Sequence, residues 1–113
     1  MRVRNATRGN SLGDSVDVAD TSAKRRTGLL KHNGLADGAG LWIAPCEAVH
    51  TFGMKFSIDV IFLSRKLQVL KLRKSMAKWR IAACLTAHSV LELPAGTLER
   101  TGTQKGDQLE FER

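Results

Sequence analysis

The sequence predicts an α+β domain with a mainly antiparallel, barrel-like β-sheet and one or two helices. Three observations lead to this prediction. The chain has 113 residues, which is the length of one domain. Hydrophobic residues make up 42% of it, enough for a core without disulfides or a structural metal. About six strand-like segments occur without the regular alternation of strand and helix that a parallel sheet requires. We therefore expect one domain over residues 1–113.

The first half of the chain predicts two strands and one helix. Val16–Ala19 alternates apolar and polar side chains like a half-buried strand. The polar residues Asp20–Ser22 can cap a helix that we expect to cover Ser22–His32. Gly28 disfavours the helical conformation, and it indicates either a close packing contact or a shorter helix. Leu41–Ile43 is a short apolar run between turn residues, which predicts a buried strand.

The second half predicts a hairpin, two more strands and a short helical segment. Ile58–Leu63 and Leu67–Arg73 are separated by a polar tripeptide, so we expect them to pair as an antiparallel hairpin. Val90–Leu93 and Gln108–Glu112 each alternate like short strands. Between them, Pro94–Arg100 is expected to form one or two helical turns with the proline at the first position.

The positive charge is concentrated in one segment. The chain carries 18 Lys and Arg against 11 Asp and Glu, a net charge of +7. Val60–Leu91 contains no acidic residue, and the rest of the chain carries equal numbers of cationic and anionic side chains. The cations of this segment are Arg65, Lys66, Lys71, Arg73, Lys74, Lys78 and Arg80. Such a segment attracts polyanions, with an affinity that falls as salt is added.

This basic segment supports an alternative functional hypothesis, binding of nucleic acid or another polyanion. Trp79 lies between two cations, and proteins that bind single-stranded nucleic acid combine aromatic stacking with phosphate neutralisation. The candidate residues are Arg73, Lys74, Lys78, Trp79 and Arg80. In the competing interpretation the cations are only solvated, and Trp79 is a core or lid residue.

Cysteine content and hydropathy predict the cellular compartment of the protein. Cys46 and Cys84 are too few for a disulfide scaffold, so we expect free thiols in a reducing environment. The N-terminal residues lack the apolar run of a signal peptide. The longest apolar-leaning stretch, Ile81–Leu91, is about half the length of a membrane helix. We therefore expect a soluble, cytoplasmic protein that does not associate with a membrane.

Four segments resemble one known family. The run from His50 to Leu63, HTFGMKFSIDVIFL, is similar to a motif of domain-of-unknown-function family 192, from bacteria and archaea. Ser22–Leu30 resembles the helix of that family, although Leu30 replaces its usual Met. Gly40–Ile43 resembles a family strand, and Val90–Gly96 followed by Gly106-Asp107 resembles its C-terminal pattern. The resemblance covers about residues 16–112 and implies a small, mainly β domain. It implies no activity.

Two arrangements of cysteine and histidine suggest other chemistry. Cys46 and His50 have the same spacing as Cys84 and His88, and the four could form a zinc set. Residues four apart in a strand are about 13 Å from each other, so we expect no metal site. Cys46 and His50, with Asp59 as orienting carboxylate, could alternatively serve a thiol-dependent enzyme. The family-specific cysteine-enzyme signatures are absent, as are phosphate-loop, dinucleotide and hydrolase motifs, so we expect no cofactor and favour a protein that is not an enzyme.

The leading functional hypothesis is a binding domain for a small molecule. Polar and soft side chains cluster beside apolar strands around the turn His50–Met54, which is typical of a ligand pocket. Asp59 interrupts an apolar run, where a buried carboxylate needs hydrogen bonds, and we expect it to accept them from this turn. The predicted ligand-binding residues are Trp42, His50, Thr51, Met54 and Asp59.

Overall fold

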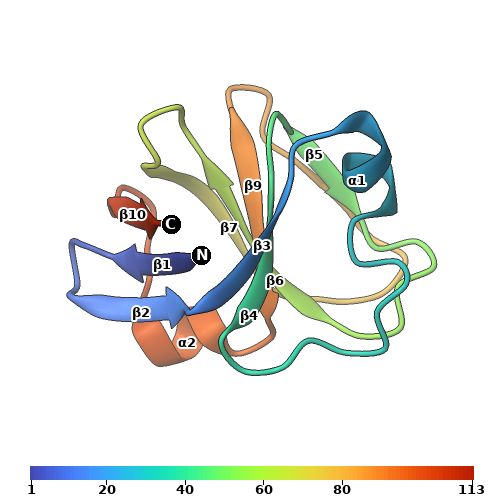
Figure 1. Ribbon diagram of the computed structural model, residues 1–113, viewed down its shortest axis with the longest axis horizontal. Coiled ribbons are helices and arrows are strands. Elements are labelled where there is room, and N and C mark those ends of the chain that lie inside the picture. The colour runs from blue at the N-terminus through green and yellow to red at the C-terminus, as the bar shows by residue number, and fades with distance from the viewer.

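Ten strands and two short helices form the structure, a computed structural model that describes residues 1–113 (Figure 1). The strands are β1 (Arg2–Asn5), β2 (Asn10–Gly13), β3 (Ser15–Ala19), β4 (Ala39–Ile43), β5 (Ala48–His50), β6 (Ile58–Leu63), β7 (Val69–Met76), β8 (Ile81–Ala83), β9 (Ser89–Pro94) and β10 (Leu109–Glu112). The helices are α1 (Ser22–Thr27) and α2 (Thr97–Thr101). Neither helix is long or apolar enough to cross a membrane.

The strands form a central sheet of five strands and two smaller sheets. The central order is β3-β4-β9-β6-β7, in which only the pair β3–β4 is parallel. The small sheets are β10-β1-β2 and β5-β8, both antiparallel. The predicted α+β class with a mainly antiparallel sheet is confirmed. The central sheet is open, with β3 and β7 as its edges.

Both faces of the central sheet are covered, which produces two hydrophobic clusters. Alternate residues of β6 enter opposite clusters: Ile58, Val60 and Phe62 enter the first, and Ile61 and Leu63 enter the second. The chain after α1 and the pair β5–β8 cover the first cluster, whereas β1, β2, β10 and α2 cover the second. Every residue of β6 is therefore buried.

Helix α1 is shorter than predicted. Thr21 caps its start, with Oγ1 accepting a hydrogen bond from the Lys24 amide at 3.2 Å. Gly28 ends it with a φ of 49°, and its amide donates to the Lys24 carbonyl at 2.9 Å. The expected extension to His32 is thus wrong, because Gly28 adopts a φ of 49° with a ψ of −128°, a conformation open to glycine that stops the helix.

The six predicted strands are all present, but the sequence analysis missed four others. The missed strands are β1, β2, β5 and β8, each of which has three or four residues. The predicted hairpin is the pair β6–β7. Pro94 ends β9 instead of starting a helix, and Gly96 precedes α2 as its N-cap.

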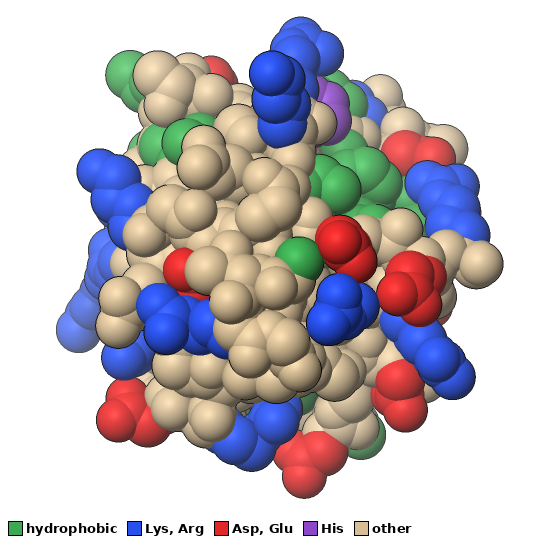
Figure 2. All heavy atoms as spheres, turned by 90° about the vertical axis from the view of Figure 1, so that its left-hand side faces the viewer, with side chains coloured by type: hydrophobic (Ala, Val, Ile, Leu, Met, Phe, Trp, Pro, Cys, Tyr) green, Lys and Arg blue, Asp and Glu red, His purple; other side chains and the backbone are tan.

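The face formed by β1, β2 and β10 does not carry the excess charge. Figure 2 shows this side of the molecule, where Lys and Arg side chains are interspersed with Asp and Glu. Arg4 pairs with Glu110 there at 3.1 Å, and Arg8 pairs with Asp107 at 2.6 Å. This mixed surface agrees with the balanced charge outside Val60–Leu91.

Candidate functional site

A buried carboxylate, that of Glu92, lies near the middle of the central sheet. Glu92 belongs to β9 and is in register with Leu41 on β4 and Val60 on β6. Gly40 lets the two strands approach closely, because a Cβ at this position would lie 2.9 Å from the Glu92 carbonyl oxygen. Only 5% of Glu92 is exposed. Glu92 is therefore a buried ionisable group between the apolar residues Leu91 and Leu93.

The Glu92 side chain faces a small cavity between the sheet and the end of α1. The cavity has a volume of about 90 Å³. Its lining residues are Arg25, Arg26, Thr27, Gly28, Leu29, Leu30, Ile43, Cys46, Ala48, Val49, His50, Met54 and Glu92. They come from α1 and the residues after it, from the end of β4, and from β5 and the turn that follows. Segments far apart in the sequence therefore build what we call the Glu92 cavity.

Burial determines the electrostatics of the Glu92 cavity. Desolvation raises the pKa of Glu92 from 4.5 to about 7, and no hydrogen bond or ion pair opposes this shift. At neutral pH the carboxyl group is thus present in both protonation states. A buried group with such a pKa can exchange a proton or a hydrogen bond with a bound molecule without a large change in its own free energy.

Cys46 also lines the cavity, but as a protonated thiol. Desolvation raises its pKa, and a backbone hydrogen bond at Ala48 only partly opposes this rise. In the structure the Sγ donates to the Ala48 carbonyl at 3.1 Å, as a protonated thiol does. An activated nucleophilic cysteine needs a lowered pKa. Cys46 and His50 thus line the same cavity, as a thiol-dependent enzyme would require. The Cys46 thiol is protonated, however, and such an enzyme needs a thiolate.

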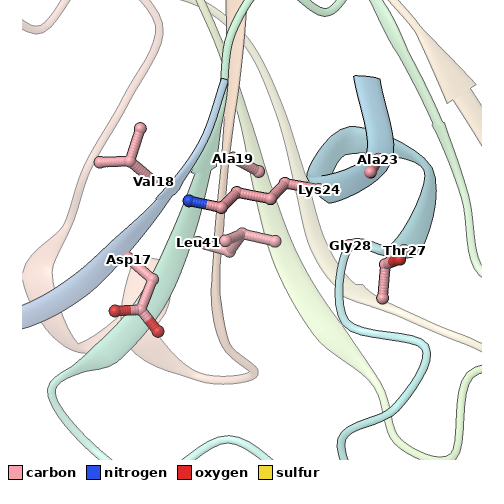
Figure 3. Close-up of a pocket in the computed structure, with 8 residues that line it drawn as sticks. All are labelled: Asp17, Val18, Ala19, Ala23, Lys24, Thr27, Gly28 and Leu41. Carbon is pink, nitrogen blue, oxygen red and sulfur yellow. The ribbon is translucent and has the colours of Figure 1, made fainter. Parts of the chain in front are cut away.

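A second hollow lies on the opposite side of α1. It is a groove of about 580 Å³ between this helix and the strands β3 and β4. Lys24 extends from the helix across the groove toward β3, passing over Leu41 (Figure 3). Thr27 and Gly28 line both hollows, so the end of α1 separates them. The groove is wide, and its one carboxyl residue, Asp17, is exposed, whereas Glu92 is buried in the other cavity.

The structure brings together two of the five predicted ligand-binding residues. His50 and Met54 line the Glu92 cavity. Trp42 packs with the second hydrophobic cluster, on the other face of the sheet, where its ring meets Phe111 edge-on at 4.9 Å. Thr51 is buried, and its hydroxyl donates to the Ala77 carbonyl at 2.6 Å. Thr51 therefore joins two loops and does not line the cavity.

Asp59 is buried as predicted, but its expected hydrogen-bond partners are wrong. One carboxylate oxygen accepts from the Ser75 amide at 2.7 Å, and the other accepts from the Leu98 amide at 2.8 Å. Asp59 follows Ile58 by one residue and so points to the face of the sheet opposite the first cluster. The turn His50–Met54 lies with the first cluster, which is why Asp59 cannot support it.

The basic segment is exposed and includes an aromatic side chain. Trp79 is 65% exposed, so the interpretation of this residue as part of the core is wrong. Lys74 forms an exposed ion pair with Glu99 at 3.2 Å, and Arg73 lies half-buried on β7. Lys78 and Arg80 flank Trp79 in the loop between β7 and β8. The five predicted residues thus divide between a strand and this loop.

The cysteine and histidine side chains do not form a metal-binding site. No three His, Cys, Asp or Glu side chains are close enough together to hold a metal ion. Cys84 lies next to Thr86, with 3.6 Å between Sγ and Oγ1, whereas Cys46 bonds to Ala48. Both cysteines are free thiols, as predicted.

Comparisons with known proteins identify relatives in archaea. A UPF0127 protein of Thermococcus sibiricus is 32% identical over 114 residues, which cover 96% of this chain and 73% of the relative. A UPF0127 protein of Pyrococcus furiosus is 30% identical over 115 residues, covering 96% of this chain and 97% of the relative.

Two solved structures share the fold. One is a protein of unknown function from Novosphingobium aromaticivorans, with a TM-score of 0.83 and 22% identity, covering 98% of this chain and 84% of that one. The other, described as a putative transcription regulator from Sinorhizobium meliloti, has a TM-score of 0.83 and 24% identity, covering 96% of this chain and 89% of that one. A family model, DUF192 (Uncharacterized ACR), matches residues 3–111. With this match over almost its whole length, the chain belongs to the DUF192 family.

Proposed function

We propose that this protein binds a small molecule, or a small protruding group of a larger one, in the Glu92 cavity. The observation that carries the proposal is the Glu92 carboxylate, which is 5% exposed, has no hydrogen-bond or ion-pair partner within the protein and lines the Glu92 cavity. A buried carboxyl group without partners lowers the stability of the fold. A ligand that supplies the missing hydrogen bond would remove this cost.

The lining favours a ligand with a hydrogen-bond donor and a short apolar part. The carboxylate accepts hydrogen bonds, so it matches an ammonium or hydroxyl group. Leu29, Ile43, Val49 and Met54 supply apolar contacts around it. A cavity of about 150 Å³ holds a benzene molecule, so a cavity of about 90 Å³ admits only a few non-hydrogen atoms. Small amines, alcohols and amino alcohols satisfy these conditions.

Binding accounts for the site better than thiol catalysis does. The raised pKa of Cys46 keeps its sulfur protonated, which opposes nucleophilic attack. The hydrogen bond from Sγ to the Ala48 carbonyl further fixes the thiol as a donor. In this proposal Cys46 only lines the cavity, whereas the Glu92 carboxylate binds the hydrogen-bond donor of the ligand.

To test the proposal, methylammonium, ethanolamine and glycerol are titrated into the protein as probes. Two-dimensional amide NMR detects their binding. We expect at least one probe to shift the amide signals of His50, Cys46 and Glu92. Binding of an ammonium probe should tighten between about pH 6 and pH 8, as Glu92 ionises around its pKa of about 7. Binding of glycerol should change less over this range, because a hydroxyl group carries no charge.

Matched variants assign the binding to Glu92. Glu92→Gln keeps the shape of the side chain but removes its charge, and it should weaken ammonium binding at least about tenfold, the usual scale for a lost charged hydrogen bond. Glu99→Gln makes the same change on a side chain that is 80% exposed, and it should bind like the wild type. Equal binding by both variants, or no probe that shifts the cavity signals, would refute the proposal.

A further inference from the structure

Three rings form a row on the surface at one end of the molecule. The centroids of His50 and Phe52 are 5.3 Å apart, and those of Phe52 and Trp79 are 5.7 Å apart. Phe52 is 42% exposed and Trp79 is 65% exposed. We call these three residues the aromatic row. Exposed aromatic side chains in contact with each other are unusual on the surface of a folded domain and indicate an interaction site.

The aromatic row is held in place by hydrogen bonds to Thr51. The Thr51 hydroxyl accepts from the Arg80 amide at 2.8 Å and donates to the Ala77 carbonyl at 2.6 Å. The Thr51 amide donates to the Arg80 carbonyl at 2.9 Å. These bonds tie the loop after β5 to the loop after β7, so the Phe52 and Trp79 rings stay together in the absence of a partner.

Trp79 adopts a backbone conformation that side chains of its kind avoid. Its φ is 62°, in the left-handed region. A bulky residue persists there only where its surroundings require it, and such positions are frequent at binding sites. A glycine would satisfy the turn at lower cost. The fold thus keeps a large exposed ring where the backbone alone favours a small residue.

Cationic side chains flank the aromatic row in the sequence. Lys78 and Arg80 flank Trp79, and Lys55 belongs to the loop that carries Phe52. Neither the segment 51–57 nor the segment 77–80 contains an acidic residue. The Arg80 guanidinium donates through Nη1 to the Trp79 carbonyl at 3.3 Å, which holds it against the backbone of this loop. Rings and cations therefore occupy the same surface.

From this combination we propose that the aromatic row, with Lys78 and Arg80, binds single-stranded nucleic acid. Unpaired bases can stack on the exposed rings, and the phosphates can pair with the adjacent cations. A duplex hides its base faces, so it can use only the cations. This site is distinct from the Glu92 cavity, although His50 contributes to both.

To test this proposal, the protein is titrated into labelled single-stranded RNA or DNA of about 12 nucleotides. Fluorescence anisotropy measures the binding at several salt concentrations up to about 150 mM. We expect both Trp79→Ala and Phe52→Ala to weaken binding about 5- to 150-fold, the range for loss of one stacked base. Lys78→Ala with Arg80→Ala should weaken binding and lower its salt dependence. Near-UV circular dichroism checks that each variant is folded.

Matched controls separate this site from general attraction to a basic protein. Leu85→Ala removes another apolar side chain, 80% exposed in a different loop, and should bind like the wild type. Lys31→Ala with Lys105→Ala removes two cations elsewhere and should have a smaller effect than the Lys78 and Arg80 pair. The proposal is overturned if the aromatic variants bind normally, if a duplex binds as well as the single strand, or if the wild type binds no oligonucleotide. Trp79-dependent binding to anionic lipid vesicles in place of oligonucleotides would also overturn it.

Discussion

Asp59 on β6 accepts a hydrogen bond at 2.8 Å from the backbone amide of Leu98 in α2. Its other carboxylate oxygen accepts from the Ser75 amide at 2.7 Å. Ser75 has a positive φ of 47°, so the carboxylate also stabilises an uncommon backbone conformation near the end of β7. One buried side chain thereby connects a central strand with an edge strand and a helix.

Substitution of Asp59 should therefore destabilise the fold. Asp59→Asn replaces one of the two acceptor oxygens with an amide NH₂ group, which faces a backbone donor. We expect the free energy of unfolding to fall by about 2–3 kcal/mol, the scale of a lost charged hydrogen bond to a buried group. Urea unfolding measures this difference. Wild-type stability in Asp59→Asn would contradict a structural role and would restore Asp59 as a candidate for ligand binding.

Glu92 should make the stability of the protein depend on pH in the opposite direction from most carboxylates. Its pKa is about 7 in the folded state against 4.5 for an unburied group. Between these values the folded protein holds a proton that the unfolded chain has released, so stability falls as pH rises. The full effect is about 3 kcal/mol. Glu92→Gln lacks this titration, and its stability relative to wild type should increase from about pH 4.5 to pH 7 and then remain constant.

Urea unfolding of both proteins at a series of pH values measures this difference. Glu99→Gln serves as the control, because this exposed side chain should leave the pH profile of the wild type unchanged. A wild-type profile that runs parallel to that of Glu92→Gln would show that the carboxyl group is solvated or paired.

The sequence predicted the strands that alternate clearly or are strongly apolar, and missed the short ones. β6 and β9 were found because they are buried and bounded by turn residues. β1, β2, β5 and β8 have only three or four residues and contain polar or small side chains, so they carry little periodic signal. They exist because tertiary contacts with the two hydrophobic clusters select them.

The candidate site was predictable only in part. The turn His50–Met54 attracted attention through its residue types, and two of its members line the cavity. Glu92 was missed because a single Glu between Leu91 and Leu93 normally indicates a solvent-facing position. The available signal was Val90, which lies two residues before Glu92 and shares its face, while Leu91 and Leu93 share the other face. Apolar residues on both faces indicate a strand that is covered on both sides. Topology was needed to show this.

Asp107 should give the opposite pH response to Glu92. Partial desolvation raises its pKa, but hydrogen bonds from Arg8, Asn5 and the Gln104 amide outweigh this effect and lower the pKa below 3.8. The folded state therefore releases the proton more readily, which stabilises the protein above pH 3.8. Asp107→Asn should be less stable than the wild type at neutral pH. The difference should shrink as acid protonates Asp107, and a pH-independent difference in thermal unfolding would contradict this account.

The backbone at Trp79 permits a test that separates folding from binding. A φ of 62° costs about 1 kcal/mol for any residue with a Cβ, whereas glycine adopts it freely. Trp79→Gly should therefore be more stable than Trp79→Ala by about 1 kcal/mol in urea unfolding, although neither carries the ring. Both should lose the same oligonucleotide affinity, because stacking requires the indole and not the backbone conformation. If Trp79→Ala were the more stable of the two, the loop would not hold the left-handed conformation. If Trp79→Gly kept wild-type affinity, the aromatic row would not be the binding site.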